Sequence, residues 1–165
     1  MCWAVASVGF YGLTYACGSL SKHTYTNLVM MGVVDIVGYA PPGILVELMG
    51  AHELQIASFV GAWAALTGCA FSEHGSMVMI TCALLGRLFL DFAFTTVFLL
   101  LLECFAADCR GTMCGVANCF ARLCTLITPL LMLMPVTQAL LLIAAFCLIG
   151  AVATWTLPKA EKAKS

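Results

Sequence analysis

Four ionisable residues stand inside long apolar runs of this sequence: Asp35, Arg87, Asp91 and Arg122. Placing a charged side chain at the centre of a bilayer costs at least ~2.5–3.5 kcal/mol on insertion scales. A charge kept in such a run is therefore a candidate for substrate binding, proton transfer or ion pairing. Two acids and two bases sum to zero, which suggests mutual pairing.

Two interpretations of these charges stay open. In the first, Arg87 pairs with Asp91 four residues further along the same helix, and Asp35 pairs with Arg122 across helices. In the second, one charge is left to meet a substrate or a proton. Desolvation offsets most of the attraction in a buried pair, so retained intramembrane charges are more easily explained by transport than by stability.

Arg122 belongs to a small and polar stripe. At helical spacing one face of the run 111–133 carries Gly111, Gly115, Asn118, Arg122, Thr125 and Pro129. Arg122 would lie ~16 Å into that helix, near the middle of a hydrocarbon core of about 30 Å. We expect the stripe to face protein or a water-filled cavity rather than lipid. The Gly111–Gly115 pair also fits a close helix approach, and Tyr11 and Tyr39 are further candidates to line a cavity.

The elements that must position these residues are membrane helices. The chain is 63% hydrophobic and 9% charged over 165 residues, whereas a soluble domain is about 45–50% apolar and about 25% charged. This predicts an all-α integral membrane protein and excludes a soluble signalling role. No basic patch is present for nucleic acid. No basic region precedes the first apolar run, so we expect the first helix to direct its own insertion.

Six runs are long enough to cross a bilayer, which needs about 20 mostly apolar residues. They are 2–20, 25–46, 55–71, 76–104, 111–133 and 138–157. Pro41 and Pro42 should kink or break the second. We therefore expect one six-helix domain over 1–158 and a polar cytoplasmic tail over 159–165. With both termini cytoplasmic, one basic residue lies outside, Lys22, and four lie inside: Arg110, Lys159, Lys162 and Lys164.

No cofactor, metal site or enzyme activity is expected. Five cysteines recur every five residues from Cys104 to Cys124, a step that scatters them around a helix instead of gathering them at a metal. The three histidines, His23, His52 and His74, should lie in solvated loops. GxSxG, HExxH, GxxxxGK and GxGxxG motifs are absent.

The stretch from Gly86 to Pro129 resembles the organic cation/anion transporter family of the major facilitator superfamily. Gly86-Arg87 takes the place of that family's Gly-Lys/Arg pair, and Glu103-Cys104-Phe105 the place of Glu-Leu-Phe. Arg110-Gly111 follows at the family's spacing, and FARLCTLITP resembles its Ala-Arg segment in helix eleven. With VASVGFYGLTY like helix seven and Asp35 at an acidic position of helix eight, the resemblance covers helices seven to twelve.

The resemblance implies one half of a major-facilitator fold, built of two three-helix repeats, that transports small organic ions by alternating access. Family members with Arg at the position of Arg122 tend to be anion transporters, so anions are favoured. Asp35 and Arg87 would shape the cavity, while Glu103, Arg110 and Glu47 match gate positions. A second six-helix half, or a homodimer, would be needed beside the lipid bilayer. The plasma membrane is the expected location.

The chain also departs from the family pattern. The basic residues of the loop after helix eight are replaced by Leu48, Ala51 and His52, and the proline after Glu-Leu-Phe is Ala106. These changes keep an alternative open, in which the chain is a truncated or degenerate membrane protein that pairs with a transporter and does not itself transport. A sugar-type or other major-facilitator substrate is a further alternative.

Overall fold

The computed structural model describes residues 1–20, 24–131 and 133–157, which form helices joined by short turns, with no strand among them. The helices are α1 Cys2–Leu20, α2 Thr24–Gly38, α3 Pro41–Met49, α4 Ala51–Phe71, α5 Met77–Cys104, α6 Ala107–Thr125, α7 Thr128–Leu131 and α8 Val136–Trp155. The predicted class, an all-α membrane protein, is confirmed. Predictions about Lys22, His23 and the tail 159–165 lie outside the described residues.

Four segments are long and apolar enough to cross a membrane: α4, α5, Ala107–Leu131 and α8. The pair α2 and α3 adds a fifth if it forms one bent span, with 44° between its two parts. Helix α1 is 19 residues long and has no charged side chain. The count of six spans stays a prediction.

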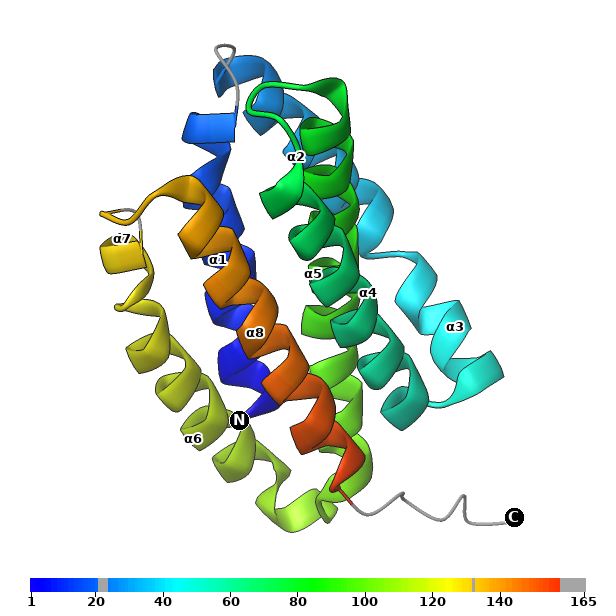
Figure 1. Ribbon diagram of the computed structural model, residues 1–165. Coiled ribbons are helices and arrows are strands. Elements are labelled where there is room, and N and C mark those ends of the chain that lie inside the picture. Colours follow the sequence, from blue (N-terminus) through cyan, green and yellow to red (C-terminus); the bar gives the residue numbers. More distant parts are fainter. Residues whose placement is uncertain (21–23, 132, 158–165) are drawn as a thin grey trace.

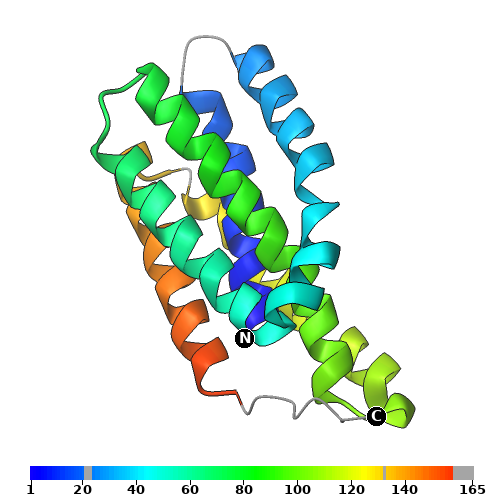
Figure 2. The same ribbon diagram turned by 90° about the vertical axis from the view of Figure 1, so that its right-hand side faces the viewer.

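Helices α1 and α5 are the central elements of the bundle (Figure 1). Helix α1 contacts α2, α5, α6, α7 and α8, while α5 contacts α1, α2, α3, α4 and α6. Helices α4 and α8 pack against each other on one side of this pair. Helices α2 and α6 lie at opposite edges, and Figure 2 shows α2 and α3 running beside α5.

Glycines allow the central helices to approach closely, as is common in membrane proteins. A Cβ atom added at Gly9 would lie 2.8 Å from Leu90 of α5, and one at Gly150 would lie 3.0 Å from Phe59 of α4. One at Gly61 would lie 2.7 Å from the Phe89 ring. The predicted close approach at Gly111 and Gly115 is wrong within the described chain, because nothing lies within 4 Å of an added Cβ at either position.

Two spans are interrupted in mid-course. The first breaks at Tyr39–Ala40, as predicted, because Pro41 and Pro42 suit the first positions of a new helix. The second, predicted as continuous over 111–133, ends its first part at Thr125. Pro129 explains this break, since it has no N–H for a bond to residue 125 and its ring would clash with that carbonyl.

Two predicted loops are shorter than expected. The segment 47–54 is almost wholly helical, because α3 and α4 meet at Gly50, whose φ of 91° turns the chain between them. His52 is thus in the first turn of α4 and is half-buried, not in a solvated loop. The turn after α5 is limited to Phe105 and Ala106. His74 is exposed in its loop, as predicted.

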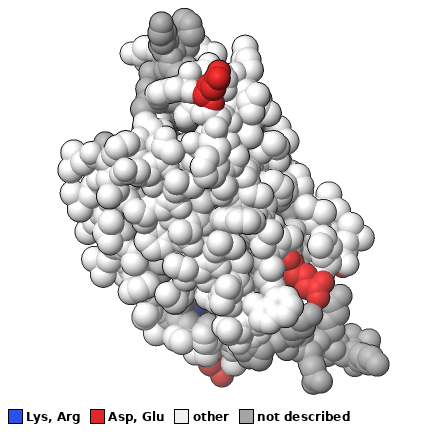
Figure 3. Space-filling view, in the orientation of Figure 1, with Lys and Arg blue, Asp and Glu red and all other residues white. Residues whose placement is uncertain are grey.

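The outer face over α8 and α4 suits contact with lipid. Figure 3 shows it mostly uncharged, with acidic atoms near its top and in its lower part and a small basic spot low on the face. Many large apolar side chains are exposed on the described surface, among them Leu148, Ile149 and Val152 of α8. A soluble protein would bury such residues, whereas a bilayer solvates them.

The glycine contacts generate a stability prediction. Gly61→Ala should destabilise the bundle by about 1–3 kcal/mol, because the new methyl group overlaps the Phe89 ring. Gly43→Ala is the matched control, since nothing lies within 4 Å of its added Cβ. Melting followed by circular dichroism in detergent should place G61A below G43A. An equal or higher melting temperature for G61A would show that the α4–α5 contact is looser than described.

Candidate ion-binding site

Arg87 of α5 is buried and has a partner at every guanidinium nitrogen. Its Nε and Nη2 donate to the two carboxylate oxygens of Asp35 on α2, at 2.7 and 2.8 Å. Its Nη1 donates to the Phe10 carbonyl at 2.7 Å and to the Thr14 hydroxyl at 2.6 Å, both on α1. This two-point pairing is the strongest geometry available to an arginine and a carboxylate. The Arg87 side chain therefore links three helices.

The ring of Phe10 completes the environment of Arg87. The guanidinium carbon lies 3.4 Å from the ring centroid, within the range of a cation–π interaction. Only 4% of the Arg87 side chain is exposed, against 26% for Asp35. One side of the ion pair, the Asp35 carboxylate, is therefore accessible, while the guanidinium is enclosed.

Asp91 lies one turn further along α5. Its Oδ1 is 3.9 Å from Arg87 Nε, which already donates to Asp35. The Asp91 side chain has no exposed surface, and neither of its oxygens has a hydrogen-bond partner among the described residues. The predicted pairing of Arg87 and Asp91 is thus a secondary contact. The predicted pairing of Asp35 with Arg122 is wrong, because Asp35 is held by Arg87.

Arg122 is the charge left over. It lies in the last turn of α6, is exposed, and its Nη1 donates to the Tyr11 hydroxyl of α1 at 2.6 Å. Its guanidinium carbon is 5.5 Å from the Tyr11 ring centroid. No ion pair joins Arg122 to an acid within the described chain. Its Nε and Nη2 have no hydrogen-bond partner among the described residues, and the C-terminal end of α6 favours a cation there.

The other predicted binding residues lie at the edges of this region. Asn118 is exposed one turn before Arg122 on α6. Tyr39, 47% exposed, lies at the break between α2 and α3 and interacts electrostatically with Asp91, Asp35, Arg87 and Tyr11. Phe10, which contacts Arg87, and Tyr11, which accepts from Arg122, are consecutive on α1 with ring centroids 5.3 Å apart, so the Arg87 cluster and the Arg122–Tyr11 pair are neighbours. The predicted set is therefore spread over α1, α2, α5 and α6.

The three predicted gate residues lie near the same end of the bundle. Helices α3 and α5 end there and α6 begins there (Figure 1). Glu47 and Glu103 are exposed, and Arg110 Nε donates to the Phe105 carbonyl at 2.8 Å. No ion pair joins these three residues in the described part of the chain. Their gating role stays a prediction.

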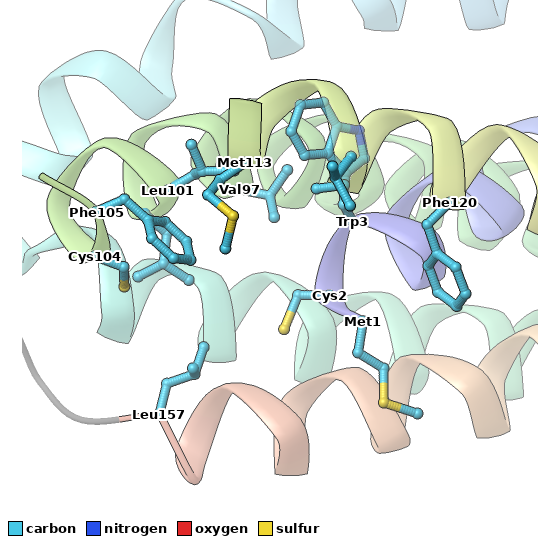
Figure 4. A pocket seen from close by; sticks show the side chains of 13 residues that line it. Met1, Cys2, Trp3, Val97, Leu101, Cys104, Phe105, Met113, Phe120 and Leu157 are labelled. Atoms are coloured by element: carbon cyan, nitrogen blue, oxygen red, sulfur yellow. The ribbon is translucent and has the colours of Figure 1, made fainter. Parts of the chain in front are cut away.

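An apolar cavity of about 410 Å³ lies at this same end. Figure 4 shows side chains of α1, α5 and α6 around it, among them Trp3, Leu101, Met113 and Phe120. None of the described residues that line it has a charged side chain. The cavity therefore offers an ion no partner, and the charged groups above are a separate feature.

Metal ligands do not gather anywhere in the described residues, where no group of three His, Cys, Asp or Glu side chains could hold an ion. Every cysteine whose side chain is described is free. Both ring nitrogens of His52 are buried without a hydrogen-bond partner among the described residues. His52 lies in the first turn of α4, away from the ion pairs of α5.

No family model matches the chain. It is 25% identical to an organic cation transporter-like protein of Drosophila melanogaster over 78% of its length. It is 26% identical to solute carrier family 22 member 7 of Rattus norvegicus over 99% of its length, and 26% identical to organic anion transporter 3 of Oryctolagus cuniculus over 79%. The chain resembles organic cation and anion transporters over most of its length. These matches confirm the similarity inferred from the motifs.

The chain spans about a quarter of the length of these organic ion transporters: 23%, 31% and 24% of the three. Each is named for transport or as a solute carrier, and none as an enzyme. The similarity and the apolar helices together identify this chain as an integral membrane protein with the sequence character of an organic ion transporter.

Two contributors to the site were missed by sequence reasoning. They are the Phe10 carbonyl and ring, and the Thr14 hydroxyl, which hold Arg87 from α1. The available signal was their spacing: Phe10, Tyr11 and Thr14 lie on one face of a charge-free helix. A hydroxyl group at Thr14, one turn after Phe10 and Tyr11 on this helix, indicates a polar contact with a neighbouring helix.

The geometry of Arg87 predicts strong coupling with Asp35. Arg87→Gln or Asp35→Asn alone should each cost about 1.5–3 kcal/mol, because each removes the charge-assisted two-point hydrogen bond between Arg87 and Asp35. The double variant should lose clearly less than the sum of the two single losses. Thermal unfolding of the four proteins in one detergent measures this. Additive losses would mean that the pair contributes nothing as a unit.

Proposed function

We propose that this chain is one half of a carrier that moves small organic ions, anions in preference, across a membrane by alternating access. The observation that carries the proposal is the contrast between two arginines at the bundle's charged region. Arg87 is enclosed and fully paired, whereas Arg122 is exposed and, among the described residues, hydrogen-bonds only to the Tyr11 hydroxyl. A free guanidinium in an apolar surrounding suits a carboxylate, sulfate or phosphate group.

The interruptions of two membrane spans, near Asp35 and Arg122, are a second argument for placing the binding site in this region. Treating α1 to α4 and α5 to α8 as two three-helix repeats, the middle span of each is interrupted: α2 from α3, and α6 from α7. Asp35 precedes the first break by about one turn, and Arg122 precedes the second similarly. Interrupted helices in corresponding positions of repeats are a mark of transporter binding sites.

The residue roles follow from position. Arg122 would bind the anion, with the Tyr11 hydroxyl and Asn118 beside it. Asp35 and Arg87 would shape the cavity wall, and Tyr39 would line it at the break. Glu47, Glu103 and Arg110 would gate the cytoplasmic end during rocking of the two halves. The proposal includes two further points: both termini lie in the cytoplasm, and the carrier lies in the plasma membrane.

The other half of the carrier is a required partner in this proposal. Helix α6 is covered mainly by α1, and most of its small and polar stripe is exposed, including Gly115, Asn118 and Arg122. Exposing Arg122 to hydrocarbon would cost at least ~2.5–3.5 kcal/mol. A second six-helix half, on the same polypeptide or on another copy, would cover this face and enclose the site.

One observation favours the second candidate, a non-transporting membrane protein that pairs with a transporter. Within the described residues, the gate positions Glu47, Glu103 and Arg110 form no ion pair with one another. A sugar or other major-facilitator substrate is the remaining alternative, and it would leave Arg122 without a charged ligand.

Substrate uptake tests the assignment of Arg122. In liposomes holding the native carrier, Arg122→Ala should lower uptake of an organic anion about 10- to 100-fold, the equivalent of one lost charge-assisted hydrogen-bond pair. Tyr11→Phe should lower it less, and Tyr15→Phe, one turn further along α1 and 55% exposed, is the matched control. Background uptake by a correctly folded wild-type sample would reject transport. Full uptake in R122A would reject the site.

The size of the native polypeptide tests the half-carrier assignment. An antibody against the tail PKAEKAKS should detect a band at about twice 17.5 kDa or more under denaturing conditions. A band at 17.5 kDa instead requires a partner chain, which cross-linking at the exposed Cys119 of α6 would capture. Failure of both would leave α6 uncovered and contradict the proposal.

A further inference from the structure

Asp91 is a carboxylate that the proposed function does not use. It has no exposed surface and no hydrogen-bond partner for either oxygen among the described residues. The backbone of α2 closes over it, since a Cβ added at Gly38 would lie 2.8 Å from Asp91 Oδ2. The nearest base, Arg87, is already paired with Asp35 through both Nε and Nη2.

The charge count around Asp91 does not balance when every group is ionised. Two carboxylates, Asp35 and Asp91, share a single guanidinium, and Arg122 is engaged separately with Tyr11 on α1. An ionised carboxylate with no donor in a dry interior is strongly unfavourable. When two carboxylates share a site, a proton on one of them removes the excess charge.

We propose that Asp35, Arg87 and Asp91 form a proton-binding site, with the proton on Asp91 when Arg87 is paired with Asp35. On α1, the Phe10 carbonyl and the Thr14 hydroxyl accept hydrogen bonds from Arg87. Tyr39 lies at the break after α2, near the same acids. The remaining charged groups on the packed helices lie elsewhere. Glu47 is near the end of α3, and His52 and Glu53 are in the first turn of α4.

The site exchanges its proton by a switch of partners. The O–H bond of Asp91 breaks and the proton passes to Asp35, while Arg87 moves its hydrogen bonds from Asp35 to Asp91. Total charge and atoms are unchanged by this exchange. Asp35 is 26% exposed, so a proton on it can reach water, whereas Asp91 is fully enclosed. Coupling of this proton to ion movement would rest on the proposed function, but proton binding itself does not.

Infrared spectroscopy of the purified protein tests the site without any transport measurement. In a detergent free of carboxyl and ester groups, the wild type at neutral pH should show the C=O band of a protonated carboxyl group that shifts on exchange into D₂O. Exposed carboxyls are ionised at that pH and do not contribute. Of the described acidic residues, only Asp35 and Asp91 are not exposed.

Three variants should change the band in different directions. Asp91→Asn removes the proton carrier and should abolish the band. Asp35→Asn frees Arg87 for Asp91, so it should also abolish the band. Arg87→Gln leaves both acids without a base and should increase the band about twofold. Glu73→Gln, an exposed loop position, is the matched control and should leave the band unchanged.

Several outcomes would overturn the proposal. A band that survives in D91N places the proton on another group. A band that persists in D35N shows that Arg87 does not exchange between the two acids. Helix content by circular dichroism identifies any variant that does not fold, and in that case the wild type alone decides. Absence of a protonated carboxyl band in the wild type at neutral pH contradicts the site.

Discussion

The architecture depends on the solvation of one guanidinium. Arg87 is taken out of water in the middle of a membrane helix, and its charge must be met entirely by the protein. The two oxygens of Asp35 and the Phe10 carbonyl meet it from two different helices. These bonds hold α1 and α2 against α5 at a defined depth and rotation. An apolar interface between smooth helices would fix neither so closely, since lipid solvates apolar side chains as well as protein does.

The same constraint separates the roles of the two arginines. Arg87 uses its donors inside the bundle, so it stabilises the arrangement of helices and has none to offer an external ion. Arg122 lies at the end of α6, on a helix that packs mainly on α1, and Tyr11 is its one partner within the part of the chain that the structure describes. We propose a recognition role for Arg122 because it has unused donors at an exposed interruption of a membrane span, and a structural role for Arg87 because every donor of its guanidinium is used.

The similarity to organic ion transporters suggests why the two arginines differ in exposure. The positions of their side chains come from the structure alone. The matched relatives are about four times as long as this chain, which is compatible with the proposal that a further part of a carrier covers the exposed polar stripe on α6. The proposed proton site is a property of this chain's own side chains. It arises because a second carboxylate, Asp91, is enclosed beside a guanidinium that already has its partner.

Sequence reasoning identified the four apolar spans that the structure bears out, the break at Pro41 and the four charges inside apolar runs, because each depends on local chemistry. Hydropathy sets where a helix is solvated by lipid, and a proline limits its own backbone. The interruption before Pro129 follows from the same rule and was predictable, although a continuous helix was expected there. The helical structure of 47–54 could not be predicted in this way. Gly50 alone separates α3 from α4, and the residues on both sides of it are helical.

Only the tertiary structure decided which charges meet. Asp35 was expected to pair with Arg122, yet it lies against Arg87, 52 residues away in sequence. Pairing of this kind depends on how each helix is rotated about its axis and how deeply it lies, and small residues such as Gly9 and Gly38 set both through contacts with α5. Sequence spacing places a residue on a face of its own helix. It does not say which helix that face meets, because that is set by the packing of the whole bundle.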